Sequence, residues 1–391
     1  MLRITVTTLL DHSTVTVEGR VAGPWADELA ACWEGLVATR AATSIRIDLN
    51  AVTFIDASGK GLVRTMQDQG AVLVSTELMR RTIVDDGARR GPHGKGGVTM
   101  RVSEQPIVWF VTGASRGFGL EIARAALERG DLVVAAARDR DAVVRALGVP
   151  ERLLPVPLDV TDAVQAGAAV EAALGRFGRI DVLVNNAGRG LLGAVEEASP
   201  EEVRSVFAVN VDGLLTVTRA VLPSMRERKS GRIVNMSSVG GFTGGPGWGV
   251  YAATKFAVEG LSEALHAELL PLGIGVIVVE PGVFRTDFLD PSSLQRVRRT
   301  IDDYAATAAV TRQWADQTSH AQPGDPVRAA AAIIAVATSP EPPLRLQLGA
   351  DCVARVEEKL ARVAAELTAW RDVALSTGYA APAGCTGDSL A

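Results

Sequence analysis

Residues 107–128 read IVWFVTGASRGFGLEIARAALE, and this stretch decides the fold. It begins with an apolar run typical of a buried parallel strand and ends, from Leu120 on, with the composition of a helix. Between them Gly113, Gly117 and Gly119 lie in a turn. Glycines there let the backbone approach a pyrophosphate, and the helix N-terminus offers it unpaired N–H groups. The stretch therefore predicts a strand, a phosphate-binding turn and a helix.

The same alternation of strands and helices continues toward the C-terminus. Near-continuous apolar runs predict parallel strands that are covered by helices on both faces. We expect these strands at Ile107–Thr112, Leu132–Ala136, Leu153–Pro157, Val182–Asn185, Gly231–Met236 and Ile274–Glu280. Residues 104–391 are therefore predicted to form an α/β domain with a doubly wound parallel sheet of the Rossmann type.

Upstream, residues 85–97 read DDGARRGPHGKGG and have no apolar periodicity, which predicts a linker over 87–103. Residues 1–86 are predicted to form a smaller α/β domain. Its strands are expected at Arg3–Thr8, Val15–Arg20, Ser44–Leu49 and Ala71–Val74, and its helices at Pro24–Arg40, at Ser58–Gln69 and from about Thr76. Met100 lies where a free-standing second module would begin, and the sequence leaves open whether translation also starts there.

Composition restricts the class of protein. Of the 391 residues 47% are hydrophobic and 22% charged, and the formal net charge is −5. This is typical of a globular α/β protein and argues against a nucleic-acid surface, which needs clustered Lys and Arg. The apolar runs are too short to cross a bilayer, and the N-terminal segment lacks the apolar core of a signal sequence. Cys32, Cys352 and Cys385 are too scattered to be metal ligands, so we expect a cytoplasmic protein with no metal and no membrane partner.

The strand at Leu132–Ala136 leads into Arg138 and Asp139, where a dinucleotide site distinguishes a ribose 2′-hydroxyl from a 2′-phosphate. A carboxylate there would accept from the hydroxyl and repel the phosphate, whereas an arginine pairs with the phosphate. Arg138 and, from the glycine turn, Arg116 therefore favour NADP(H) over NAD(H). Asp139 argues in the other direction, and the alternative is that both arginines are solvated surface residues.

The spacing T-G-x-x-x-G-x-G from Thr112 to Gly119 resembles the short-chain dehydrogenase/reductase family, and further motifs of that family follow in order as far as Thr286. The resemblance implies that Asp159-Val160 meets the adenine, that the Asn186–Gly188 turn lies beside the cofactor ribose, and that the Pro281–Thr286 turn orients the nicotinamide carboxamide. The predicted cofactor-binding residues are Gly113, Ser115, Arg116, Gly117, Phe118, Gly119, Arg138, Asp159, Val160, Asn186, Ala187, Gly188, Tyr251, Lys255, Pro281, Gly282, Val283 and Thr286.

Tyr251 and Lys255 are four residues apart, so on a helix they lie on the same face. A carbonyl that receives a hydride needs a proton, and a neighbouring cation lowers the pKa of a phenol from its usual value of about 10. We predict that Tyr251 is the general acid/base and that Lys255 lowers its pKa. The resemblance adds Ser238, which polarises the substrate oxygen, and Asn210, which holds a water between Lys255 and solvent. These four residues predict an NADP(H)-dependent oxidoreductase that interconverts an alcohol and a ketone or aldehyde.

The substrate is less well specified. In the family its pocket is built by two segments, which here are Arg189–Gly193 and Phe284 to about Trp314. The aromatic and apolar side chains of the second segment favour an apolar ligand. The alternative is that these side chains only pack the helices of that segment, which would form a lid over the pocket. These residues are Phe288, Leu289, Tyr304 and Trp314. Reduction with NADPH is favoured by the resemblance alone, and the sequence does not identify the substrate.

Assembly is predicted in the same way. Family members usually pair through the helices that here carry Asn210 and Tyr251, which implies a homodimer or homotetramer. The C-terminal helix, expected from Asp351 to about Ala374, has apolar residues at helical spacing and is predicted to bury one face on its own sheet or on a partner. These apolar residues are Val353, Val356, Leu360, Val363 and Leu367.

Residues 2–84 resemble a STAS domain, the fold of anti-sigma factor antagonists, through Gly23-Pro24-Trp25 and the loop around Asp56. In that family a serine at the helix start can be phosphorylated, and Ser58 occupies the position. A phosphate there would add negative charge next to Asp56 on a docking surface. The alternative is that Asp56 or Ser58 only caps the helix. The resemblance implies a protein-binding module, and a rival function is a signalling protein that only senses NADP(H) and is phospho-regulated at Ser58.

Overall fold

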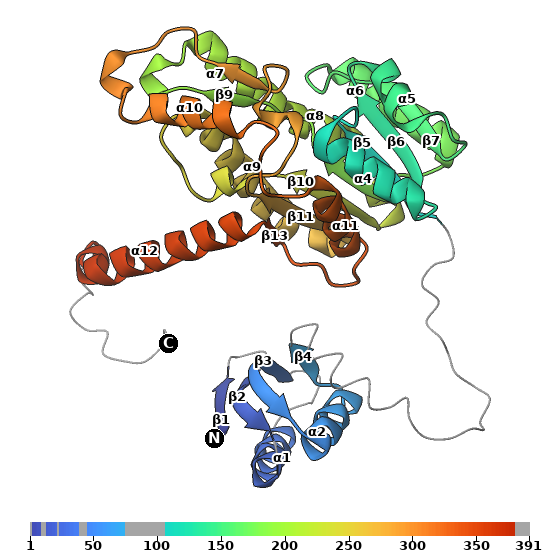
Figure 1. Cartoon of the computed structure of the whole chain (residues 1–391). Coiled ribbons are helices and arrows are strands. Elements are labelled where there is room, and N and C mark those ends of the chain that lie inside the picture. The colour runs from blue at the N-terminus through green and yellow to red at the C-terminus, as the bar shows by residue number, and fades with distance from the viewer. Residues whose placement is uncertain (1, 9–12, 22, 39–44, 75–105, 380–391) are drawn as a thin grey trace. The chain divides into compact units, whose positions relative to one another are not determined.

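The computed structural model describes residues 2–8, 13–21, 23–38, 45–74 and 106–379. The chain divides into two compact units, Met1–Met100 and Arg101–Ala391 (Figure 1). The predicted linker, the predicted helix from Thr76, Met100 and Cys385 lie outside the described residues.

The first unit is a four-stranded sheet of order β1-β2-β3-β4 with two helices. β1 and β2 are antiparallel, whereas β2, β3 and β4 are parallel. β3 extends past the predicted end at Leu49 because Val52 and Ile55 also bury their side chains in the core, beyond register shifts in its pairing with β2. The elements are β1 (Leu2–Thr8), β2 (Ser13–Val21), α1 (Pro24–Val37), β3 (Ile45–Ile55), α2 (Ala57–Asp68) and β4 (Val72–Val74).

The second unit contains a seven-stranded sheet of order β13-β11-β10-β8-β5-β6-β7, in which every neighbouring pair is parallel. Six strands lie where the apolar runs predict them. The seventh, β13, was not predicted, because its sequence RLQL is only partly buried and alternates polar with apolar residues. The strands are β5 (Val108–Thr112), β6 (Leu132–Ala137), β7 (Leu153–Pro157), β8 (Val182–Asn185), β10 (Gly231–Met236), β11 (Ile274–Pro281) and β13 (Arg345–Leu348).

Helices cover both faces of this sheet, as the buried strands require. One face packs against α4, α5 and α11, through residues such as Ile122, Val143 and Ile333. The other packs against α6, α8 and α9, through residues such as Val170 and Val217. These helices are α4 (Gly117–Glu128), α5 (Arg140–Leu147), α6 (Ala163–Phe177), α8 (Gly213–Arg228), α9 (Gly249–Leu269) and α11 (Pro326–Ala337).

The stretch Pro200–Arg228 is long and apolar enough to span a membrane by length and composition alone. It consists of α7 (Pro200–Phe207), the π-helical segment η4 (Ala208–Asp212) and α8. Val217, Val221 and Met225 of α8 are fully buried against the sheet. These three apolar residues therefore belong to the core of the unit.

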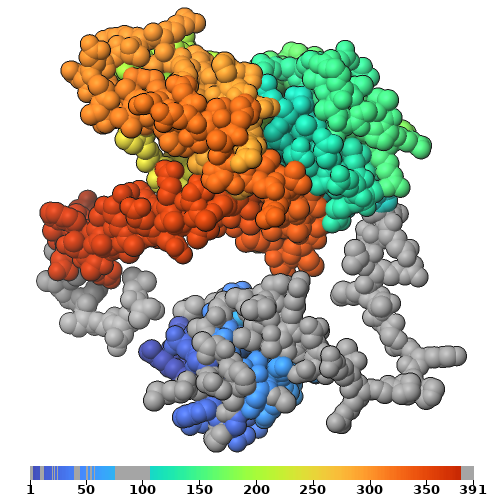
Figure 2. Space-filling view, viewed as in Figure 1, coloured from blue at the N-terminus to red at the C-terminus, as the bar shows by residue number. Residues whose placement is uncertain are grey.

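The C-terminal helix α12 (Ala350–Leu375) extends beyond the rest of its unit (Figures 1 and 2). Cys352 and Val356, near its start, pack against Val239. Leu360 and Leu367 remain 55% and 61% exposed. Within the described residues, the apolar face is therefore buried on its own unit only over the first turns.

Candidate active site

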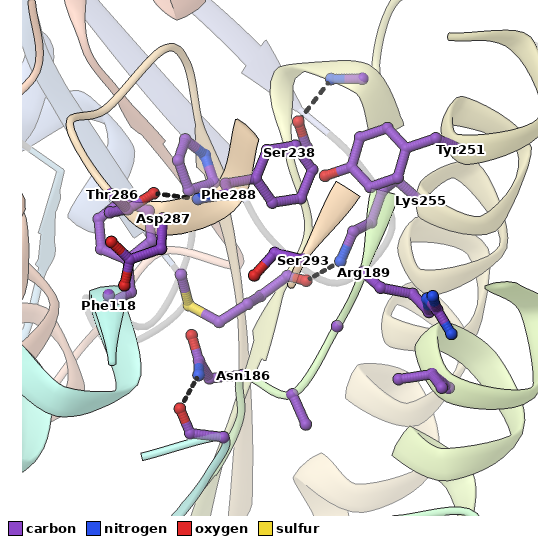
Figure 3. A pocket seen from close by; sticks show the side chains of 18 of the residues that line it. Phe118, Asn186, Arg189, Ser238, Tyr251, Lys255, Thr286, Asp287, Phe288 and Ser293 are labelled. Atoms are coloured by element: carbon purple, nitrogen blue, oxygen red, sulfur yellow. Dashed lines mark hydrogen bonds between the residues drawn. The ribbon is translucent and has the colours of Figure 1, made fainter. Parts of the chain in front are cut away.

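The strand order reverses between β5 and β8, because β6 and β7 lie beyond one of them and β10, β11 and β13 beyond the other. Ligands of open α/β sheets bind outside the carboxyl ends of the strands at such a point. A cavity of about 610 Å³ opens there (Figure 3). Predicted residues that line it are Gly113, Ser115, Arg116, Gly117, Phe118, Arg138, Asp159, Val160, Asn186, Ala187, Gly188, Ser238, Tyr251, Lys255, Pro281, Gly282, Val283 and Thr286. Gly119 and Asn210 lie behind its wall, and Ser58 belongs to the first unit.

The glycine turn fits a bound pyrophosphate. Gly113 and Gly117 have φ angles of 66° and 54°, in the left-handed region that glycine adopts more readily than other residues. A Cβ on Gly119 would lie 2.4 Å from Asn186 Nδ2 and from the carbonyl oxygen of Gly113. The N-terminus of α4 has no side-chain cap, whereas Asp162 caps α6, so the first N–H groups of α4 remain available to an anion.

Hydrogen bonds fix this turn to the end of β8. The Thr112 hydroxyl accepts from the backbone N–H groups of Asn186 and Ala187, both at 3.0 Å. Asn186 Nδ2 donates to the Thr112 carbonyl at 2.8 Å. The two segments predicted to meet the cofactor therefore form one rigid cradle at the strand ends.

Beyond the turn, two positions bear on the choice between NADP and NAD. The Arg138 side chain is exposed and lines the cavity. Asp139 instead caps α5, accepting from Ala142 N at 3.0 Å, and pairs with Arg145 at 3.1 Å. Arg116 lines the cavity but donates to the carbonyl oxygen of Ser292 at 2.9 Å, on the segment after β11.

Ser238, Tyr251 and Lys255 lie together at one end of the cavity, with Ser238 and Tyr251 facing each other (Figure 3). Ser238 follows β10, and its Oγ accepts from Gly240 N at 3.0 Å, which fixes its rotamer. Tyr251 is in the first turn of α9 and is 8% exposed. Burial raises the pKa of Tyr251 to about 12, and the nearby Ser238 hydroxyl acts in the opposite direction.

Lys255 lies one turn further along α9 and is 6% exposed. Its Nζ donates to the carbonyl oxygen of Met236 at 2.8 Å and lies 5.8 Å from the centre of the Tyr251 ring. Burial lowers the pKa of Lys255 to about 8, and the negative charge of Glu259 raises it. The ammonium therefore lies beside the tyrosine ring, but the predicted lowering of the pKa of Tyr251 is not found, because burial instead raises that pKa.

Asn210 lies in η4, a π-helical segment of a type that is frequent at functional sites. Its Nδ2 donates to Thr254 Oγ1 and to the carbonyl oxygen of Arg189, both at 2.9 Å, and its Oδ1 accepts from Arg189 N at 2.8 Å. A Cβ on Gly188 would lie 3.3 Å from Asn210 Oδ1 and 3.7 Å from Lys255 Nζ. Asn210 thus joins the Arg189 backbone to the helix that carries Tyr251 and Lys255.

Aromatic rings form the wall beside Tyr251. The Phe288 and Trp248 rings lie 5.4 Å and 5.7 Å from the Tyr251 ring, centre to centre. Leu289 and Trp314 also line the cavity, as predicted. Tyr304 lies outside the cavity and donates to Glu196 Oε2 at 2.7 Å, so of the two alternatives for this residue the structure does not support the one that it covers a ligand.

The predicted pocket segment Arg189–Gly193 also differs from the prediction. Only Arg189 of it lines the cavity. Residues Gly190–Leu192 form β9, which pairs with β12 (Leu294–Arg296) and buries Leu192 against Leu289. This pairing joins the two predicted pocket segments and turns the side chains of the first one toward the core, away from the cavity.

Sequence reasoning missed Thr243 and Trp248, which line the cavity, and Arg355, which reaches it from α12. Thr243 and Trp248 lie between Ser238 and Tyr251 and could have been found from that position. Arg355 has no local signal, because the chain folds back across the sheet to bring it there.

One group among the described residues has the spacing of metal ligands: Asp287, Asp290 and His320. Its histidine Nε2 is 2.9 Å from Asp290 Oδ1. Exposed acidic groups are common without an ion, and we assign the group no role.

Comparison with known proteins gives consistent matches to the second unit. A family model described as short chain dehydrogenase matches residues 107–296. The protein named Oxidoreductase BOA17 of Botryotinia fuckeliana is 39% identical over 272 residues, which are 69% of this chain and 98% of that protein.

Solved structures agree. A short-chain dehydrogenase from Streptomyces avermitilis is 45% identical, with a TM-score of 0.65 over 70% of this chain and 100% of that one. A 3-ketoacyl-(acyl-carrier-protein) reductase from Brucella melitensis, complexed with NADH, is 30% identical, with a TM-score of 0.53 over 62% of this chain and 96% of that one.

Proposed function

This chain belongs to the short-chain dehydrogenase family and is an NAD(P)-dependent oxidoreductase acting on CH–OH or C=O groups, and we propose that it reduces an apolar ketone or aldehyde with NADP(H). The observation that carries the proposal is the juxtaposition of Ser238, Tyr251 and Lys255 at one end of a cavity whose other end is the glycine turn. Loss of NADPH absorbance in the presence of a panel of ketones and aldehydes tests it.

Each residue of the set has a distinct task. The nicotinamide, when bound, supplies the hydride. Ser238 donates to the carbonyl oxygen and polarises it, and Tyr251 gives that oxygen its proton. Lys255 stabilises the phenolate that remains, because its ammonium lies beside the ring. Asn210 holds the backbone at Arg189 and the start of α9 in register, and the water predicted between Lys255 and solvent would bind next to it.

The preference for NADP(H) is supported by the engagement of Asp139 in the cap of α5. The carboxylate that would repel a 2′-phosphate does not line the cavity, and the exposed Arg138 does. Arg116 is positioned to contribute only if it leaves the Ser292 carbonyl.

Replacing Arg138 with alanine is expected to remove a charge-assisted interaction worth about 1.5–3 kcal/mol. The affinity for NADPH should fall by roughly 10- to 100-fold, whereas that for NADH should change little. Fluorescence titration with both cofactors measures this. Arg140→Ala is the matched control, because Arg140 is a neighbouring exposed arginine that does not line the cavity. Equal losses for NADPH and NADH in Arg138→Ala would contradict a 2′-phosphate site.

The first unit is proposed to be a STAS-like protein-binding module. Asp56 accepts from Gly59 N at 2.8 Å and from Gly23 N at 2.9 Å, so it caps α2 and fixes the start of α1. These bonds lower the pKa of Asp56. Ser58 is exposed in the first turn of α2, which supports the proposal that it is phosphorylated.

If the units have separate roles, Ser58→Asp and Ser58→Ala should leave kcat and the NADPH affinity unchanged. The rival function, a sensor that binds NADP(H) without turnover, instead predicts coupling between Ser58 and cofactor binding and no reduction of any carbonyl. Steady-state kinetics of both variants separate the two.

We further expect a cytoplasmic homodimer or homotetramer. The pairing elements implied by the family are the helical stretch Pro200–Arg228, which carries Asn210, and α9, which carries Tyr251. The exposed apolar stripe of α12 offers a second surface for a partner.

A further inference from the structure

The helix that carries Tyr251 and Lys255 also carries a third buried ionisable residue. Glu259 lies one turn after Lys255 on α9, and its side chain is 8% exposed. Residues four apart on a helix share a face, so these three side chains follow one another from the cavity into the protein. The reaction described above leaves Glu259 without a task.

Arg345 of β13 holds Glu259 from the far side. Its Nε lies 3.2 Å from Glu259 Oε2 and 3.3 Å from Glu280 Oε1 in the neighbouring strand β11. The Glu280 side chain is fully buried, and its Oε2 accepts from Gln347 Nε2 at 3.1 Å. Arg345 also pairs with Glu263, which is 58% exposed at the surface of α9.

The charges alternate through this cluster. Lys255 is followed by Glu259, then Arg345, then Glu280, so basic and acidic side chains alternate and all four lie largely out of water. Buried charges are stable only when paired. Removing one member of the cluster therefore shifts the pKa values of the neighbouring ionisable groups.

The loop that carries Ser238 lies beside the carboxyl group of Glu259. A Cβ on Gly241 would lie 2.4 Å from Ser237 Oγ and 3.1 Å from Glu259 Oε1. Both oxygen atoms are buried, and the Ser237 hydroxyl lies close enough to Glu259 to lower the pKa of its carboxyl group. Met236, which accepts from Lys255 Nζ, immediately precedes Ser237.

We propose that Glu259, clamped by Arg345 and Glu280, is a positioning residue that keeps the Lys255 ammonium charged and directed at Tyr251. The inference rests on the proposed function, because it assigns the role of Glu259 through Lys255. Burial lowers the pKa of Lys255 to about 8, into the range where a counter-charge decides its protonation, and Glu259 raises that pKa. Burial, together with the charge of Glu280, raises the pKa of Glu259 itself to about 7, although the Ser237 hydroxyl and Arg345 act in the opposite direction.

Several elements packed against Glu259 contribute polar or ionisable groups to its surroundings. Helix α9 supplies Lys255 and Glu263, β11 supplies Glu280 and β13 supplies Arg345. The loop after β10 supplies the Ser237 hydroxyl, and α12 supplies Cys352, whose thiol donates to the carbonyl oxygen of Glu280 at 3.0 Å. Burial raises the pKa of this thiol to about 12, so it stays neutral when Glu259 titrates.

NMR titration of lysine labelled with ¹³C at Cε tests the proposal without any substrate. The chain has only five lysines, and Lys255→Arg assigns the signal of Lys255. In Glu259→Gln the midpoint of Lys255 should fall by about one pH unit, because the carboxylate that favours the ammonium is gone. Glu263→Gln is the matched control: it removes another carboxylate from Arg345, and the Lys255 midpoint should stay within about 0.2 units of wild type.

The wild-type titration gives a second test that does not depend on the folding of a variant. If Glu259 acts on Lys255, the Lys255 curve has two steps, one at the pKa of Glu259 and one at its own. A single step in the wild type, or an unchanged midpoint in folded Glu259→Gln, would overturn the proposal.

The pH profile of turnover gives the functional readout. Reduction needs the ammonium, so its alkaline limb should move to lower pH in Glu259→Gln and not in Glu263→Gln. A loss of kcat that is equal at every pH would indicate a merely structural role and contradict the proposal. Absence of turnover in the wild type would count against the proposed function alone, because the NMR result would still stand.

Discussion

Replacement of Tyr251 by phenylalanine is expected to lower kcat by about 10²- to 10⁴-fold, the range that a positioned general acid contributes. The ring remains, so its packing against Trp248 and Phe288 is preserved and only the hydroxyl is lost. Because burial raises the pKa of Tyr251 to about 12, the wild-type phenol keeps its proton near neutral pH and can give it to the reduced carbonyl. Steady-state kinetics with NADPH measure the loss.

The affinity for NADPH should change much less, by about tenfold at most, since the variant loses at most one hydrogen bond to the cofactor. Tyr304→Phe is the matched control, because Tyr304 lies outside the cavity and should keep full turnover. Near wild-type kcat in Tyr251→Phe would mean that another group delivers the proton.

Replacement of Arg345 by methionine is expected to give the largest loss of stability, about 3–5 kcal/mol, because it leaves buried carboxylates without their cation. Glu280 is fully buried and Glu259 nearly so, and Arg345 is the arginine that pairs with both. Chemical denaturation followed by circular dichroism measures the free energy of unfolding. Glu263→Gln, which removes only the exposed partner, should cost about 0–1 kcal/mol.

The loss should grow with pH. Arg345 lowers the pKa of both Glu259 and Glu280, so without it their folded-state pKa values rise further above the unfolded ones. A group with a raised pKa stabilises the fold at acidic pH and loses that contribution as pH rises through the folded value. The difference from wild type should therefore be smaller at pH 5 than at pH 8. A deficit independent of pH would show that packing, and not charge, explains the loss.

The cofactor cradle was predictable because its signals are local. The glycine turn, the Asn186–Gly188 turn and the Tyr251–Lys255 pair each lie within a few residues, and the alternating βα pattern brings the strand ends to one edge. The structure places all but two of the predicted cofactor and catalytic residues of this unit on the cavity wall.

What the sequence did not reveal depends on distant parts of the chain. Arg345 and Glu259 are 86 positions apart, and Gln347 and Glu280 are 67 apart, so no local pattern marks them as partners. β13 was missed for the same reason, since its polar residues belong to this cluster. Tyr304 and Gly190–Leu192 were assigned to the pocket from their place in the chain, but the pairing of β9 with β12 turns that segment toward the core.

Hydride transfer from NADPH to a carbonyl carbon can be measured with an isotope label. NADPH carrying deuterium at C4 of the nicotinamide, in each of the two epimers in turn, would be incubated with the protein and the ketones and aldehydes that support turnover. We expect deuterium on the carbinol carbon of the product with one epimer and not with the other, and almost none with Tyr251→Phe. Cofactor binding without reduction of any carbonyl, or NADPH oxidation that leaves no deuterium in an alcohol, would contradict it.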